Sequence, residues 1–142
     1  MLEYRKRKMT EKTKSVLKSS QLDVLENDCN LILKYKGVNF VGVINFLGNL
    51  IAGGFKKGIT SMGNENTRHM MYMQLKLDLA MRQDYDKLFG PVDYVISRRA
   101  KFTKVSIPVN KYMILLITKN GINCESIIKK TSTVFKSSLG GF

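Results

Sequence analysis

The sequence predicts a single α/β (α+β) domain, in which helices pack against one five-stranded antiparallel sheet in the order α-β-β-α-β-β-β-α. Its 142 residues allow one hydrophobic core and are too few for two independent ones. Hydrophobic residues make up 44% and charged residues 25%, as in ordinary globular proteins. Apolar residues follow a helical period in three segments and a strand pattern in five. We expect the domain to span residues 15–138, after a basic arm (1–14) and before a loose tail (139–142).

The first elements are a helix and a β-hairpin. Apolar residues recur at steps of three and four before Gly37, which ends the helix. They are Leu22, Leu25, Cys29 and Ile32 or Leu33. The runs Val38–Phe46 and Leu50–Phe55 are rich in β-branched and aromatic residues and flank the turn residues Gly48 and Asn49. This pattern predicts two strands joined as a hairpin.

The longest helix is predicted over residues 65–89, and Gly90-Pro91 ends it. It carries two apolar stripes. One consists of Met70, Met73, Leu77, Met81 and Leu88. The other consists of Met71, Leu75 and Leu79. A sheet can fully cover only one stripe of about 100°. We therefore expect the second stripe to be left for a partner.

Three strands and a helix complete the chain. The strands are predicted at Val92–Arg98, Phe102–Val109 and Tyr112–Lys119. The alternation around Pro108 is typical of a half-buried strand near a sheet edge, whereas the apolar run Met113–Ile117 indicates a central strand. The last helix begins near Asn123, a suitable N-cap. Its inward residues are Ile127, Ile128, Thr131, Val134 and Phe135.

Composition excludes several classes of function. Two Cys without a Cys-x-x-Cys pair and a single His argue against a disulfide framework and against a zinc site. We expect no cofactor, and no enzyme activity, because His69 has no Cys or Ser partner in the sequence. The longest apolar runs are far shorter than a membrane span, and the N-terminus lacks the apolar stretch of a signal peptide. These features predict a cytoplasmic location.

Three segments resemble the roadblock (dynein light-chain) domain, a member of the profilin-like group. They are the hairpin Val38–Ala52, the long apolar helix ending at Gly90, and the strand Tyr112–Thr118 followed by Asn123 and the terminal helix. In character the chain also resembles small uncharacterised archaeal proteins. The resemblance implies a dimer in which the long middle helices pair and the third strands can join the two sheets. It further implies a non-enzymatic scaffold or regulator of small GTPases or larger complexes.

On this basis the predicted dimer or partner interface combines the second helical stripe with the third strand. Its residues are Met71, Leu75, Leu79, Tyr94 and Ile96. Methionine suits such an adaptable surface because its side chain is flexible and polarizable.

Two alternatives remain open. Lys and Arg total 24 against 11 Asp and Glu, a formal net charge of +13 that attracts phosphate at long range. A nucleic-acid or anion surface would use Arg5, Lys6, Arg7 and Lys8 together with Arg98, Arg99 and Lys101. The second alternative is a small-molecule sensor, because GAF-type relatives hold ligands between sheet and helices.

Overall fold

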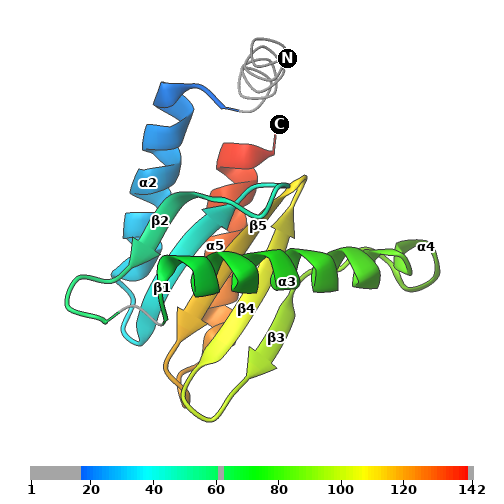
Figure 1. The fold of residues 1–142 in the computed structure, drawn as a ribbon. Helices are drawn as coiled ribbons and strands as arrows, with labels where there is room; N and C mark the ends of the chain where they lie inside the picture. Colours follow the sequence, from blue (N-terminus) through cyan, green and yellow to red (C-terminus); the bar gives the residue numbers. More distant parts are fainter. Residues whose placement is uncertain (1–16, 61–62, 141–142) are drawn as a thin grey trace.

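The computed structural model describes residues 17–60 and 63–140. Helix α2 (Ser19–Leu33) precedes the hairpin of β1 (Val38–Ile44) and β2 (Leu50–Phe55). Helix α3 (Glu65–Gln83) and the single turn α4 (Asp86–Phe89) follow. Strands β3 (Val95–Arg98), β4 (Thr103–Val109) and β5 (Tyr112–Thr118) lead to α5 (Cys124–Leu139). Apart from the extra turn α4, this is the predicted order of elements (Figure 1).

The strands form one antiparallel sheet in the order β2-β1-β5-β4-β3. β5 is central and all seven of its residues are buried, which confirms the prediction from its apolar run. β4 lies between β5 and the edge strand β3, so its predicted place near an edge is confirmed, but most of its residues are buried instead of half-buried. β3 pairs with β4 only from Thr103 to Ser106. Pro108 lies beyond the β3–β4 ladder. Its missing backbone N–H therefore leaves no carbonyl of β3 without a hydrogen-bond partner.

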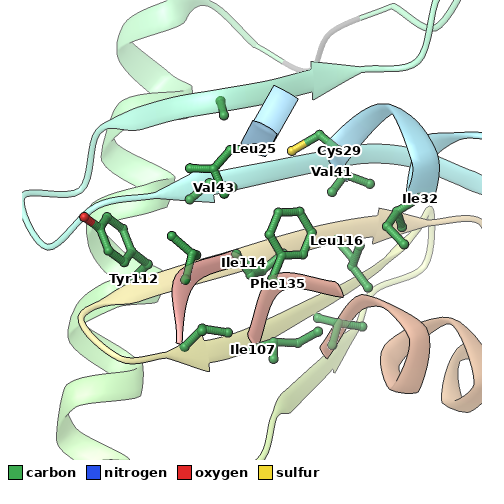
Figure 2. Close-up of a cluster of buried hydrophobic side chains, with 14 of the residues drawn as sticks. Leu25, Cys29, Ile32, Val41, Val43, Ile107, Tyr112, Ile114, Leu116 and Phe135 are labelled. Atoms are coloured by element: carbon green, nitrogen blue, oxygen red, sulfur yellow. The ribbon is translucent and has the colours of Figure 1, made fainter. Parts of the chain in front are cut away.

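Two helices, α2 and α5, cover one face of the sheet, and Figure 2 shows the core between these helices and the strands. Leu25 and Cys29 of α2 and Phe135 of α5 meet the inward side chains of the strands, among them Val41 and Leu116. These five residues are at most 1% exposed. The Ser138 hydroxyl donates a hydrogen bond to the Asp28 carboxylate and thereby joins the two helices directly. This layer contains most of the buried apolar residues of the domain.

The opposite face of the sheet is covered by α3, which crosses the strands in Figure 1. A smaller cluster forms here, in which Tyr72 and Leu79 pack with side chains of β1 and β5. The strand residues of this cluster are Phe40, Ile44, Met113, Leu115 and Ile117. The rings of Tyr72 and Phe40 lie 6.2 Å apart.

Close packing between α2 and β2 depends on a glycine. Gly53 has φ +86°, and a Cβ there would lie 2.0 Å from the Val41 carbonyl oxygen and 2.8 Å from Cys29 Sγ. Its N–H donates to Glu26 Oε1 over 3.0 Å. Only glycine therefore allows α2 to approach the hairpin in this way.

Three predicted boundaries are wrong. The long helix ends at Gln83 instead of continuing to residue 89, because Tyr85 leaves the helical conformation and its N–H bonds back only three residues, to Arg82. The third strand begins at Val95, where its ladder with Ser106 begins, instead of at Val92. Leu139 is not part of a loose tail. It is the last residue of α5, is fully buried, and accepts a hydrogen bond from the Asn110 side chain.

Candidate interaction surface

Helix α3 presents an apolar face to solvent. Met70, Met73, Leu77 and Met81 follow one another at steps of three and four, which places them on one side of the helix. Their exposed fractions are 57%, 50%, 62% and 56%. We call these four residues the outer α3 face. Large apolar residues exposed together in this way mark an interaction site more often than single exposed ones do.

The structure reverses the predicted roles of the two stripes of this helix. Leu79 is 3% exposed, and the half-buried Met71 and Leu75 pack against the sheet-facing cluster. The predicted interface stripe is thus the stripe that covers the sheet, while the stripe assigned to the core is the exposed one. The reason is Tyr72, whose large side chain lies beside Leu75 and Leu79 on the helix and packs toward the Phe40 ring.

The outer α3 face was therefore missed as a surface by sequence reasoning. The signal that could have found it is its composition, because three of its four residues are methionines, which suit adaptable surfaces. The stripe that faces the sheet contains one methionine and two leucines.

The apolar surface continues beyond α3. Met81, Tyr85 and Phe89 line one cleft of about 690 Å³ at the junction of α3, α4 and the segment before β3. The Tyr85 and Phe89 rings lie 6.0 Å apart, and Phe89 is 82% exposed. Leu88 beside it is 78% exposed. In Figure 1, α4 lies past β3, and Val95 of β3 lines the same cleft.

Strand β3 forms one edge of the sheet, since it has β4 as its single neighbour. The structure does not bring the Ile96 side chain to α3, whereas Tyr94 lines the same cleft as Met81 of α3. Ile96 pairs with Val105, whose side chain belongs to the α2–α5 core, and the Tyr94 hydroxyl donates to the Glu125 carboxylate of α5 at 2.8 Å. Both side chains lie on the α5 side because residues alternate along a strand. Ile96 is 42% exposed at the edge, and Val95 is the residue that packs toward α3.

Polar contacts hold α3 in place at its start and middle. The Asn64 side chain accepts a hydrogen bond from the Thr67 N–H at 2.8 Å and caps the helix. The Lys76 ammonium donates to the Lys111 carbonyl in the β4–β5 turn at 3.2 Å. Burial lowers the pKa of Lys76 below its usual value. These contacts fix which face of the helix points outward.

The structure describes only some of the basic residues that were predicted to bind anions. Arg98, Arg99 and Lys101 are exposed at the β3–β4 hairpin. Arg5, Lys6, Arg7 and Lys8 lie outside the described residues.

The described part of the chain contains no cluster suited to holding a metal ion, and the buried Cys29 thiol is unreactive. Within residues 17–60 and 63–140, no three His, Cys, Asp or Glu side chains are grouped to hold a metal ion. Burial raises the pKa of the Cys29 thiol to about 12, and the carboxylates of Glu26 and Asp28 add to the effect, so this thiol stays protonated and inert. None of the helices in these ranges is both long enough and apolar enough to span a bilayer.

The arrangement of sheet and helices is that of the roadblock/profilin-like fold. The chain is similar in fold to the gliding protein MglB of Thermus thermophilus (TM-score 0.74, 10% identity, 89% of this chain and 96% of that one). It is also similar to a roadblock/LC7 domain from Streptomyces avermitilis (TM-score 0.63, 8% identity, 80% and 92% covered). Profilin IB of Acanthamoeba castellanii gives a TM-score of 0.56 at 13% identity, with 83% and 99% covered.

Residues 18–137 match the model of a family of unknown function, DUF6659, and the chain belongs to this family. No curated protein matches the sequence. At identities of 8–13% the structural likeness establishes the fold, which confirms the resemblance to the roadblock domain.

Proposed function

We propose that this protein is a non-enzymatic scaffold or regulatory module that works as a homodimer. The observation that carries the proposal is the outer α3 face, an apolar helix surface whose Met81 end shares a cleft with Val95 of the edge strand β3. The roadblock resemblance implies pairing of these same two elements, the middle helix and the third strand.

The free energy gained by burying the outer α3 face is close to the cost of association, so a stable dimer needs a second contact region. Full burial of a Met or Leu side chain contributes about 1.5–3 kcal/mol, so covering the exposed half of each gives roughly 1 kcal/mol. Four residues from each of two copies then contribute about 8 kcal/mol, whereas association costs about 4–15 kcal/mol. Pairing of two β3 edges, or burial of Leu88 and Phe89, supplies the additional stabilisation.

Light scattering on a sizing column tests the dimer. The wild-type chain is expected at about twice its mass of 16.2 kDa, and Leu77→Glu is expected at the monomer mass, because the carboxylate would be buried between the helices. Leu31→Glu is the matched control. Leu31 is 49% exposed on α2, away from the proposed interface, so this variant should stay dimeric.

Salt provides a second test of the same dimer. The net charge of +13 repels a second copy, and added salt screens this repulsion, so dimerisation should strengthen as salt rises. A monomeric wild type, or a Leu77→Glu variant that keeps the wild-type mass, would contradict the proposed interface.

The partner we propose for the dimer is a small GTPase, as the roadblock resemblance implies. MglB itself has been described in a tetrameric arrangement, so the fold accommodates assemblies larger than a dimer. The test is a titration of purified small GTPases from the source organism, loaded with GDP or a GTP analogue, against wild type and Leu77→Glu. Binding that depends on the nucleotide and weakens in the variant supports a dimer-dependent regulator. Equal binding of both nucleotide states argues for a passive scaffold.

A further inference from the structure

One end of the sheet is strongly basic. Four segments meet there, as the lower part of Figure 1 shows for the start of β1, the ends of β2 and β5, and the β3–β4 hairpin. The segments are residues 34–37, 56–58, 98–104 and 119–121, and they contain nine Lys or Arg and no Asp or Glu. We call these nine residues the basic rim. They are Lys34, Lys36, Lys56, Lys57, Arg98, Arg99, Lys101, Lys104 and Lys119.

The positive charge of the rim is not neutralised by neighbouring carboxylates. Within the described part of the chain, none of the nine cations forms a salt bridge; the ion pair there joins Arg82 and Asp78 on α3. Burial lowers the pKa of Lys104, and repulsion from Arg99 lowers it further. A cation that depresses the pKa of its neighbour indicates a local excess of positive charge that an anion would relieve.

Hydrogen bonds hold the rim segments to one another. Asn120 donates through its side chain to the carbonyls of Arg99 and Ala100 at 2.8 and 3.1 Å and accepts from the Thr103 hydroxyl at 2.6 Å. This fixes the β3–β4 hairpin against the end of β5. On the other side, the Lys119 N–H donates to the Gly37 carbonyl, and Lys56 Nζ donates to the Tyr35 carbonyl. The cations therefore stand on a preorganised frame, which reduces the entropic cost of binding.

The shape of the rim matches an extended polyanion. Its cations follow the ends of five strands in order, and four strand spacings of about 4.8 Å give a row about 19 Å long. One strand of a DNA duplex carries a phosphate about every 3.4 Å, so the row spans about five phosphates. A single small anion would use only a fraction of this surface.

The rim segments themselves offer few apolar side chains for insertion into a bilayer. The exposed apolar residues next to them, Leu31 and Ile59, flank the row of cations at its β1–β2 end, where Leu31 lines a cleft with Lys34, Lys56 and Lys57. The two rings within the segments are half-buried beneath ammonium groups: Tyr35 lies 5.4 Å from Lys130 Nζ, and Phe102 lies 5.9 Å from Lys104 Nζ. Peripheral membrane proteins combine cations with exposed apolar residues, and the rim carries nine cations against these two flanking side chains, so this surface fits a nucleic-acid backbone better than a lipid surface.

We propose that the basic rim binds the sugar-phosphate backbone of nucleic acid through cations carried on a preorganised backbone frame, without reading the bases. This is a second binding activity, at the end of the sheet, and it does not depend on the α3 dimer. Since phosphate contacts dominate, affinity should fall steeply with salt and vary little with base sequence.

Fluorescence anisotropy tests the proposal with a labelled single-stranded RNA 20-mer and a labelled DNA duplex of equal length. In the variant Lys57→Glu/Lys101→Glu two exposed rim cations are reversed, and at low salt we expect about tenfold weaker binding or more. The matched control is Lys111→Glu/Lys136→Glu, at the opposite end of the sheet. It lowers the net charge by the same amount and should keep nearly wild-type affinity.

Several outcomes would overturn the proposal. Equal loss in both double variants would mean that overall charge, and not the rim, attracts the oligonucleotide. Failure of wild type to bind either oligonucleotide at low salt would exclude the activity. Tighter binding to phosphatidylserine vesicles or to polyglutamate than to both oligonucleotides would assign the rim to a membrane or an acidic protein. The neutral variant Lys57→Gln/Lys101→Gln, with a circular-dichroism melt, checks that weaker binding does not come from lost folding.

Discussion

The two faces of the sheet are covered in different ways. α5 places Ile127, Ile128, Thr131, Phe135 and Leu139 in the core, shares its face with α2, and directs its lysines to solvent. α3 is longer, with 19 residues against 16, yet only Tyr72 and Leu79 are buried and four large apolar residues face outward. The apolar content of a helix therefore does not measure how deeply the helix is buried. One helix completes the core, whereas the other also provides a surface.

The largest expected difference between the two faces concerns stability. Phe135→Ala removes a fully buried ring and should lower the free energy of unfolding by about 3–5 kcal/mol. Leu77→Ala on the outer α3 face should change it by about 0.5 kcal/mol or less at concentrations where the chain is monomeric. Urea unfolding measures both. Comparable losses of unfolding free energy in the two variants would mean that other residues of the same chain bury the outer α3 face.

A smaller effect concerns how folding stability depends on pH, and it arises on the face of the sheet that α2 and α5 cover. The pKa of Cys29 is about 12 in the folded chain, whereas a thiol in an unfolded chain has a pKa of about 8.5. Above that pH the unfolded state loses the proton and the folded state keeps it. Stability due to this group is therefore fully present below pH about 8.5 and falls by up to about 1.4 kcal/mol per pH unit until pH about 12.

Chemical unfolding from pH 8 to pH 10.5 measures this slope. Cys29→Ala is the control, since it lacks the thiol and should lose less stability over the same range. Parallel slopes for the two proteins would show that Cys29 is accessible to solvent and titrates normally.

The smallest effect compares the two helix caps. Asn64 caps α3 and Asn123 caps α5 through a hydrogen bond from the Glu125 N–H, and replacing either by Ala should cost about 1 kcal/mol. The consequence should differ, because α3 has fewer buried residues and is expected to open locally. Hydrogen exchange should show faster exchange confined to α3 in Asn64→Ala. Uniform acceleration across the whole domain would mean that α3 unfolds only together with the core.

Much of the fold follows from short-range pattern. The apolar run of β5 predicted its central place, and Leu25, Cys29 and Ile32 predicted the buried face of α2, because each of these elements has one consistent apolar pattern. The prediction of which stripe of the long helix is exposed was wrong, because the pattern there was ambiguous. With two stripes on α3, periodicity gives the angle between them but does not say which one meets the sheet.

Local patterns along the chain are enough to predict the order of the elements, the central strand, the excess of positive charge and one helix with more apolar surface than a sheet can cover. These properties are local or additive along the chain. Contacts in the folded domain are needed to show that Tyr72 turns the outer α3 face to solvent, that the Ile96 side chain lies on the opposite side of the sheet from α3, and that four distant segments join as the basic rim. Strand order and packing bring these residues together or keep them apart, and both depend on contacts between residues far apart in sequence.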